Sequence, residues 1–283
     1  MVIGSSLLLK RTLTGLAQFF VIALVLGFGF VAYIFLIEPN WVEVHRVTVR
    51  DPALAKALSG LKIAQISDLH LRKGIGWRER NVAKKISALR PDLLFVTGDW
   101  IDDLNQLGPL KGWLKHFSVR MGIWGVPGNT DYLVLDGVSL QRELAPLGVH
   151  VLVNQAERIQ TSPGKFLWLA GTDDPVERHA NLSKAIGQVP PGSPVVLLAH
   201  SPDIFEEAVR DRVNLVLVGH THGGQVGIPL FIRMSEYANR SPYIRGLFKK
   251  GGTQMYVNRG LGMKTLPVRF LCRPEITVFE VRR

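Results

Sequence analysis

The hydrophobic residues of this chain follow two different patterns. Residues 12–37 form one apolar run without a charged side chain, long enough to cross a bilayer as a helix. Beyond it, short β-rich apolar runs alternate with amphipathic helical patterns, an order that is typical of an α/β domain. We therefore predict a membrane anchor over residues 1–40, a juxtamembrane segment over 41–60 and an α/β domain over 61–283.

The α/β part contains apolar runs that we interpret as strands and amphipathic stretches that we interpret as helices. Proline, glycine and aspartate residues mark most of their ends. The predicted strands are 62–66, 93–97, 122–126, 149–153, 166–170, 195–199, 215–218, 255–258 and 276–281. The predicted helices are 78–89, 138–147, 181–186 and 202–210.

The apolar run near the N-terminus has two interpretations. A cleaved signal peptide is the alternative to a retained anchor, but the run exceeds a typical signal-peptide core and no small-residue cleavage site follows it. Orientation stays open, because Lys10 and Arg11 precede the run while Arg46 and Arg50 follow it. A span with its N-terminus inside would export the domain, whereas a helix lying at the interface would leave it in the cytoplasm.

The net charge of the chain limits the classes of partner that we expect it to bind. The formal net charge is +11 at pH 7, and Lys10 and Arg11 are the only charged residues before Glu38, so the α/β part is itself basic. A basic domain beside a membrane is attracted to anionic lipid and to phosphorylated substrates. Nucleic acid is disfavoured as a partner, because no DNA- or RNA-binding signature is present. The single cysteine, Cys272, excludes a disulfide within the chain, and nothing indicates the oligomeric state.

Metal-binding side chains recur just beyond the predicted strands. They are Asp68, His70, Asp99, Asn129, His200, His220 and His222. One such histidine is usually a hydrogen-bonded core residue, but the carboxyl edge of an α/β sheet is where ligands bind, and seven candidates gather there. Seven ligands are too many for one tetrahedral ion and suit two divalent cations that share a bridging group. Asp99 is the natural bridge, because a carboxylate can bind two cations at once.

Five motifs in this order resemble those of the calcineurin-like metallophosphoesterase superfamily. They are Asp-x-His at 68–70, Gly-Asp at 98–99, Gly-Asn at 128–129, a lone histidine at 200 and Gly-His-x-His at 219–222. The resemblance covers about residues 60–283. It implies a double β-sandwich flanked by helices and a dinuclear site of manganese, iron or zinc. No phosphate-binding glycine loop and no nucleophilic-serine motif competes with this assignment.

The resemblance also implies a role for each motif residue. Carried over, Asp68, His70, Asp99 and His222 hold the first ion, and Asp99, Asn129, His200 and His220 hold the second. A hydroxide bridging the metals attacks phosphorus in line, with Asp99, Asn129 and His220 in the catalytic centre.

A narrower resemblance, carried by the tracts at 219–226, 256–262 and 273–276, is to the membrane-anchored YkuE- and YaeI-like branch. It implies a phosphorylated lipid or nucleotide-lipid substrate such as UDP-2,3-diacylglucosamine, an intermediate of lipid A synthesis. We accordingly expect the protein at the cytoplasmic (inner) membrane. A soluble-nucleotide phosphodiesterase and a non-catalytic metal-binding scaffold are the alternatives.

One position departs from the family pattern. Many members have a general-acid histidine directly after the Gly-Asn motif, beside an aspartate, but here Thr130 replaces the histidine while Asp102 stands at the aspartate position. A threonine hydroxyl cannot deliver a proton as an imidazolium does. The substitution favours a leaving group that needs little protonation, such as a phosphate. Asp131 and His116 are alternative proton sources.

Three arginines are candidate substrate-binding residues. Arg72 and Arg78 flank Trp77 in a basic loop after the first motif, and Arg259 lies in a later glycine-rich turn. A guanidinium is suited to bidentate contact with phosphate. A solvated loop is the alternative for 72–78. An apolar and basic stretch from Tyr237 to Lys250 is expected to pack within the domain rather than contact lipid.

Overall fold

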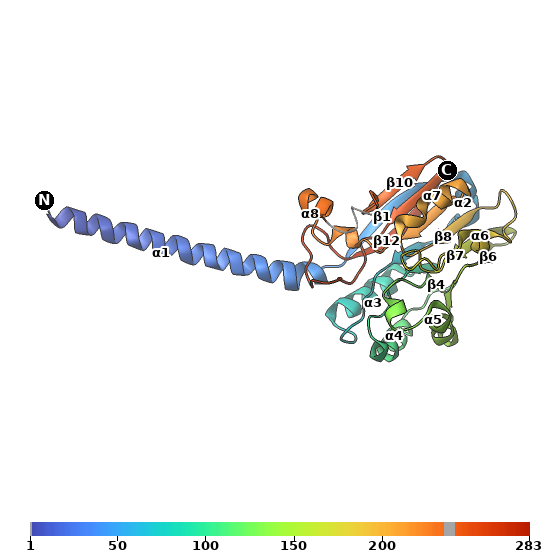
Figure 1. The fold of residues 1–283 in the computed structure, drawn as a ribbon, viewed down its shortest axis with the longest axis horizontal. Helices are drawn as coiled ribbons and strands as arrows, with labels where there is room; N and C mark the ends of the chain where they lie inside the picture. The colour runs from blue at the N-terminus through green and yellow to red at the C-terminus, as the bar shows by residue number, and fades with distance from the viewer. Residues whose placement is uncertain (1, 235–240) are drawn as a thin grey trace.

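A long N-terminal helix projects from one end of the folded part of the chain (Figure 1). In this computed structural model, the backbone is described for residues 2–234 and 241–283, and side chains for 13–232 and 241–283. Tyr237 and the side chains of Lys10 and Arg11 therefore lie outside the described residues. Helix α1 (Val2–Ala32) continues through a π-helical turn (Tyr33–Ile37) into a 3₁₀ turn (Glu38–Asn40). The segment Leu13–Asn40 is long and apolar enough to cross a membrane, and its most apolar window is not buried against the protein.

Within the described residues, the rest of the chain forms two six-stranded sheets. In spatial order, the first contains β1 (Glu43–Arg50), β12 (Glu275–Arg282), β2 (Ile63–Ile66), β3 (Leu93–Thr97), β4 (Ile123–Val126) and β5 (Val149–Val151). The second contains β10 (Gly246–Lys250), β11 (Thr253–Val257), β9 (Leu215–Val218), β8 (Val195–Leu198), β7 (Lys165–Gly171) and β6 (Gln155–Ser162). Strands β2 to β5 run parallel, and so do β7, β8, β9 and β11, so their carboxyl ends collect at one edge.

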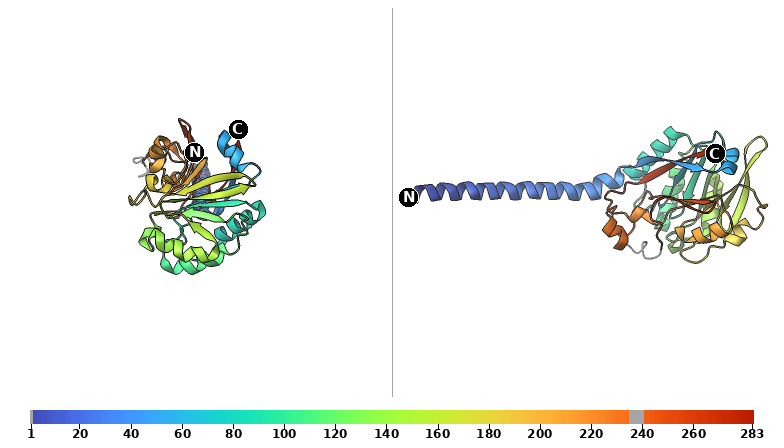
Figure 2. Two further views of the ribbon diagram at one scale, coloured as in Figure 1. Left: turned by 90° about the vertical axis from the view of Figure 1, so that its right-hand side faces the viewer. Right: turned by 90° about the horizontal axis from the view of Figure 1, so that it is seen from above.

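The two sheets pack face to face, and helices cover their outer faces (Figure 2). The layer between the sheets is apolar and includes Phe95, Trp124, Leu169, Leu217 and Phe279. The helices are α2 (Pro52–Leu58), α3 (Trp77–Leu89), α4 (Leu107–Leu114), α5 (Gly137–Leu144), α6 (Leu182–Ile186), α7 (Phe205–Arg210) and α8 (Pro229–Met234). Helices α3, α4 and α5 cover the first sheet, and α6 and α7 the second. The predicted architecture, two sheets flanked by helices with an apolar N-terminal helix, is confirmed.

Among the described residues, the sequence analysis missed three strands and the helices α2, α4 and α8. Strands β1, β6 and β10 each lie at the edge of a sheet and are more exposed than the central strands, and polar residues interrupt their apolar residues. The predicted strands matched because most of them are buried on both faces and appear as continuous apolar runs. Strand β1 lies within residues 41–60 and pairs with β12, so the segment that was predicted to be juxtamembrane contributes a strand to the first sheet. The division into three domains stays a prediction.

Candidate metal centre

The seven predicted ligands meet at the edge where the parallel strands of both sheets end. The loops after β2, β3 and β4 bring them from the first sheet, and the loops after β8 and β9 bring them from the second. Six of the side chains are buried and Asn129 is partly buried. Residues as far apart in sequence as 68 and 222 therefore share one site.

The first group consists of Asp68, His70 and His222. The Nε2 atoms of His70 and His222 are 3.1 Å apart, and Asp68 Oδ1 lies 3.5 Å from His222 Nε2. One ligand atom from each of the three residues lies within 4.8 Å of the others, a spacing suited to a single cation.

The second group consists of Asn129, His200 and His220. His200 Nε2 lies 3.1 Å from Asn129 Oδ1 and 3.1 Å from His220 Nδ1. The two histidines of the Gly-His-x-His motif thus lie in different groups, as the family resemblance implies.

Asp99 lies between the two groups. Its Oδ2 is 3.3 Å from His70 Nε2, and its Oδ1 is 3.4 Å from His200 Nε2. Each carboxylate oxygen therefore faces one group. This is the arrangement expected of a carboxylate that bridges two cations.

The buried polar atoms of this site fit a cation better than they fit one another. Asp99 Oδ2 is buried without a hydrogen-bond donor, and a buried carboxylate oxygen in that state is costly. Imidazole nitrogens, carboxylates and an amide oxygen that converge in this way form the donor set of a borderline divalent ion. The residues present therefore fit a divalent metal ion.

The backbone is strained where it presents these ligands. Asp68, His70, Asp99, His220 and His222 all have positive φ angles, from 45° to 69°. Such left-handed conformations are uncommon for residues other than glycine and concentrate at functional sites. The backbone is thus locally strained in order to direct these side chains toward one point.

Glycines leave room for the ligands. A Cβ atom at Gly219 would overlap the Asp68 carboxylate, and one at Gly98 would overlap the His200 imidazole. Gly98 also has a φ of +88°, which disfavours any other residue. The glycines that precede the ligands are therefore required by close packing as well as by the turn.

The electrostatics of the site depend on the Asp99 and His200 pair. Burial opposes the charged form of each, but their mutual attraction outweighs it, so the pKa of His200 rises to about 10 and the pKa of Asp99 lies well below its usual range. A metal ligand must be deprotonated, so a bound cation would compete with the proton on His200.

Groups outside the site fix the histidine rings. His70 Nδ1 lies 2.6 Å from Asp102 Oδ1, and His200 Nδ1 lies 2.9 Å from the carbonyl oxygen of Thr97. Since both oxygens can only accept, each Nδ1 carries the proton and Nε2 is turned toward the site. The sequence analysis placed Asp102 only by its position near an expected general acid. In the structure it orients His70 and forms an ion pair with Arg72.

We predict that Asp102→Asn weakens metal binding by about 10- to 100-fold, because the amide no longer holds the His70 ring as a charged acceptor. Titration of the metal-free protein with Mn²⁺, followed by calorimetry, measures the change. Asp103→Asn is the matched control, since Asp103 is exposed and caps a neighbouring turn. Equal affinities for the two variants would contradict a positioning role for Asp102.

Asp131, one of the alternative proton sources, is bound by backbone donors, and Thr130 occupies the position where many family members have a general-acid histidine. Asp131 accepts hydrogen bonds from the backbone N–H groups of Trp100, Ile101 and Gly128. Burial, together with the charge of Asp99, raises the pKa of Asp131 to about 7. Its carboxylate joins the loops after β3 and β4. His116, the other alternative, is exposed just beyond α4.

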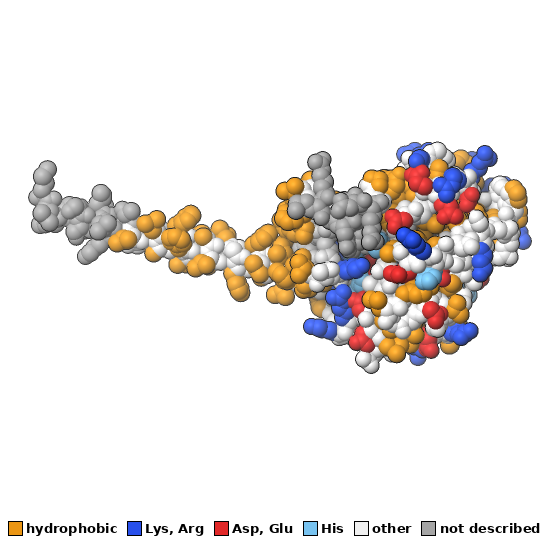
Figure 3. Space-filling view, in the orientation of Figure 1, with side chains coloured by type: hydrophobic (Ala, Val, Ile, Leu, Met, Phe, Trp, Pro, Cys, Tyr) orange, Lys and Arg blue, Asp and Glu red, His pale blue; other side chains and the backbone are white. Residues whose placement is uncertain are grey.

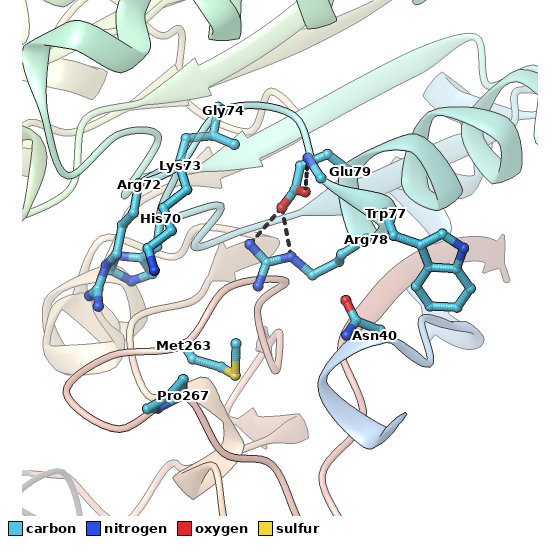
Figure 4. A pocket seen from close by; sticks show the side chains of 12 residues that line it. Asn40, His70, Arg72, Lys73, Gly74, Trp77, Arg78, Glu79, Met263 and Pro267 are labelled. Atoms are coloured by element: carbon cyan, nitrogen blue, oxygen red, sulfur yellow. Dashed lines mark hydrogen bonds and ion pairs between the residues drawn. The ribbon is translucent and has the colours of Figure 1, made fainter. Parts of the chain in front are cut away.

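A cavity of about 410 Å³ opens beside His70. Arg72, Lys73, Arg78 and Trp77 line it, as Figure 4 shows. Arg78 forms an ion pair with Glu79, and Arg72 one with Asp102. The predicted substrate-binding loop thus borders both a cavity and the first ligand group.

Arg259 lies apart from this cavity. Its guanidinium forms ion pairs with Glu275 and Glu43, and burial of the group is outweighed by these carboxylates, so its pKa is raised. The prediction that Arg259 binds phosphate stays untested, and two carboxylates already match its charge. Sequence reasoning missed Arg269, a fully buried arginine that holds the adjoining loop.

Comparisons with known proteins agree with this geometry. A family profile described as calcineurin-like phosphoesterase matches residues 61–224. The chain is 30% identical over 263 residues to YkuE of Bacillus subtilis, an uncharacterised metallophosphoesterase, with 90% of each chain covered. It is 32% identical over 276 residues to the phosphodiesterase YaeI of Escherichia coli, covering 90% of this chain and 93% of that one. It is 26% identical over 298 residues to the UDP-2,3-diacylglucosamine pyrophosphatase LpxG of Chlamydia muridarum, covering 86% and 90%.

Proposed function

The chain belongs to the calcineurin-like phosphoesterase family and hydrolyses phosphoester bonds, and from this premise we propose that it is a dinuclear, membrane-tethered enzyme that cleaves a lipid-linked pyrophosphate. The family predicted from the motif order is confirmed. The observation that carries the proposal of two metals is the position of Asp99, whose two oxygens face two separate groups of ligands.

In this proposal, Asp68, His70 and His222 hold one divalent ion and Asn129, His200 and His220 the other, with Asp99 shared. The ions are manganese, iron or zinc, which the mixed nitrogen and oxygen donor set accepts. When bound, such ions neutralise phosphoryl charge, lower the pKa of water and align the reactants.

The protein itself supplies positioning. Asp102 and the Thr97 carbonyl fix the rings of His70 and His200, so their Nε2 atoms stay directed into the site. Arg72 and Arg78 border the adjoining cavity, where we assign them contacts with substrate phosphate. Burial of the ligands excludes bulk water, which strengthens each of these electrostatic interactions.

The leaving group follows from what surrounds Thr130. Thr130 is buried, and its backbone N–H donates to Asp99 Oδ1. Its hydroxyl cannot act as an acid at neutral pH. Asp131, although its pKa is raised to about 7, is fully buried, and three backbone N–H groups occupy both of its carboxylate oxygens. Without a proton donor, departure of an alkoxide is slow, whereas a phosphate leaves readily. This supports a pyrophosphate over an alkyl ester.

The substrate class rests on the anchor and the relatives. A retained N-terminal helix keeps the enzyme beside lipids, and a relative named UDP-2,3-diacylglucosamine pyrophosphatase shares most of its length with this chain. We assign a substrate of that type, with a role in lipid A synthesis and a location at the cytoplasmic membrane.

The test is a substrate panel on the full-length, Mn²⁺-loaded protein. We expect faster hydrolysis of UDP-2,3-diacylglucosamine than of a lipid alkyl monophosphate or a cyclic dinucleotide. Thr130→His should raise turnover of the alkyl monoester by about 100-fold, the usual gain from a general acid, and leave the pyrophosphate rate nearly unchanged.

Three outcomes would contradict the proposal. Preference of the wild type for alkyl monoesters over pyrophosphates would refute the missing-acid argument. Preference for the cyclic dinucleotide would identify a soluble-nucleotide phosphodiesterase. Metal binding that is lost in His222→Ala, with no ester hydrolysed by the wild type, would identify a metal-binding scaffold.

A further inference from the structure

The end of the anchoring helix is fixed to the folded domain. Phe270 packs edge-on against Phe30, with ring centroids 5.2 Å apart, and its neighbour Arg269 donates its backbone N–H to the carbonyl oxygen of Ile34. The backbone N–H of Cys272 donates to the Glu38 carboxylate at 2.6 Å. One loop, residues 258–274 between β11 and β12, makes all these contacts, so it lies where the helix enters the domain.

Large apolar side chains are exposed on the same side of the domain. Leu230 and Phe231 of α8 are 63% and 55% exposed, and Leu266 and Leu271 of the loop are 61% and 59% exposed. Backbone pairing joins the two segments, since the N–H of Gly227 donates to the carbonyl of Phe270 at 2.7 Å. We call these four side chains the apolar face. Figure 3 shows hydrophobic side chains gathered where the helix enters the domain, with Lys and Arg beside them.

We propose that the apolar face docks on the surface of the bilayer that holds α1. Contiguous exposed apolar side chains mark interaction sites. Transfer of each one from water into an apolar environment lowers the free energy of the system. The occupant is lipid because this surface continues directly from the apolar helix through the Phe30 and Phe270 contact. The exposed cations Arg72 and Lys73 nearby suit the anionic headgroups of such a surface.

Docking would seat the cavity at the membrane interface. The cavity extends from His70 to Asn40, the last residue of the anchor, with Met263 and Pro267 of the same loop, 258–274, on one side (Figure 4). A substrate could then place its phosphates among Arg72 and Lys73 while its acyl chains stay in the bilayer. This second step rests on the proposed function, whereas docking itself does not.

Docking is tested directly with a fluorescent label. Full-length Leu266→Cys and Leu230→Cys variants are labelled with bimane and placed in vesicles of phosphatidylcholine and phosphatidylglycerol that contain spin-labelled lipid. Cys272 is fully buried and should not react. Val138→Cys is the control, because Val138 is 44% exposed on α5, which lies away from α1 in Figure 1.

We expect strong quenching by the lipid at positions 230 and 266 and little at 138. Equal quenching at all three positions would overturn the proposal. Energy transfer from bimane-labelled chains to chains that carry an acceptor dye at the same position, without lipid quenching, would instead assign the apolar face to a contact between copies and would also overturn it.

A second experiment separates docking from catalysis. The full-length variant with Leu230, Phe231, Leu266 and Leu271 all changed to Glu should hydrolyse a vesicle-embedded lipid pyrophosphate about tenfold more slowly or worse, but bis(p-nitrophenyl) phosphate at the wild-type rate. Val138→Glu should alter neither rate. Equal vesicle rates for the two variants would refute docking. If the wild type hydrolyses neither compound, the proposed function fails, and the quenching result still decides docking.

Discussion

Replacing Asp99 with asparagine should lower kcat by about 1,000-fold or more in the metal-loaded enzyme. The substitution keeps the shape of the side chain and the oxygen that accepts the Thr130 N–H. It removes the negative charge that faces both groups of ligands, and loss of several kcal/mol of electrostatic stabilisation corresponds to three decades in rate. Steady-state kinetics with metal content measured on the same sample gives the result.

The matched control is Asp103→Asn, four residues further on, where the aspartate is exposed. A second readout is independent of activity: Mn²⁺ should raise the Tm of the wild type and of Asp103→Asn, and raise that of Asp99→Asn much less. An Asp99→Asn protein that binds two equivalents of metal and turns over normally would exclude Asp99 as the bridge.

The convergence of the seven predicted ligands was predictable from the sequence because each one follows an apolar run. A strand buried on both faces, such as β3 or β9, appears as an uninterrupted apolar segment, so a charged residue directly after it is conspicuous. The parallel order of the strands then brings the carboxyl ends together. The local apolar pattern and the strand order therefore both place these residues at the same edge of the sheets.

The surroundings of the ligands were not predictable in the same way. Asp102 and Asp131 have no periodic pattern, and their partners, His70 and the backbone of Trp100, Ile101 and Gly128, follow from how separate loops meet. The phosphate-binding role predicted for Arg259 stays a prediction, but its ion pair with Glu43 was not foreseen, because Glu43 comes from β1, a strand that the sequence analysis did not predict.

Arg269 shows most plainly what sequence alone does not reveal. It follows Val268 and precedes Phe270, and nothing in that tract indicates burial of its charge. In the structure it is fully buried, and its guanidinium donates to the carbonyl oxygens of Arg259, Gly260, Gly262 and Cys272. Burial lowers its pKa to about 10, which still leaves it charged at neutral pH. This one side chain satisfies backbone carbonyls in two parts of the loop, residues 259–262 and Cys272.

The first of these parts, residues 259–262, supports the metal centre. The backbone N–H of Leu261 donates to the carbonyl of Ser67, and that of Gly262 to the carbonyl of Asp68. The Asp68 side chain lies so close to Gly260 that a Cβ there would contact it at 2.8 Å. Arg269 thus positions the backbone that backs a predicted ligand.

Arg269→Met should therefore lower the free energy of unfolding by about 4 kcal/mol or more. Three buried carbonyls and one partly buried carbonyl lose a charged donor, at about 1–3 kcal/mol each, and the gain from no longer burying a cation offsets only part of this. Urea unfolding of the full-length protein in micelles measures the loss, and Arg282→Met is the control because that arginine is exposed. Arg269→Lys should be nearly as damaging, since one ammonium cannot reach all four carbonyls. Wild-type stability in Arg269→Met would show that water or backbone rearrangement satisfies these carbonyls, and that the guanidinium does not hold the loop behind Asp68.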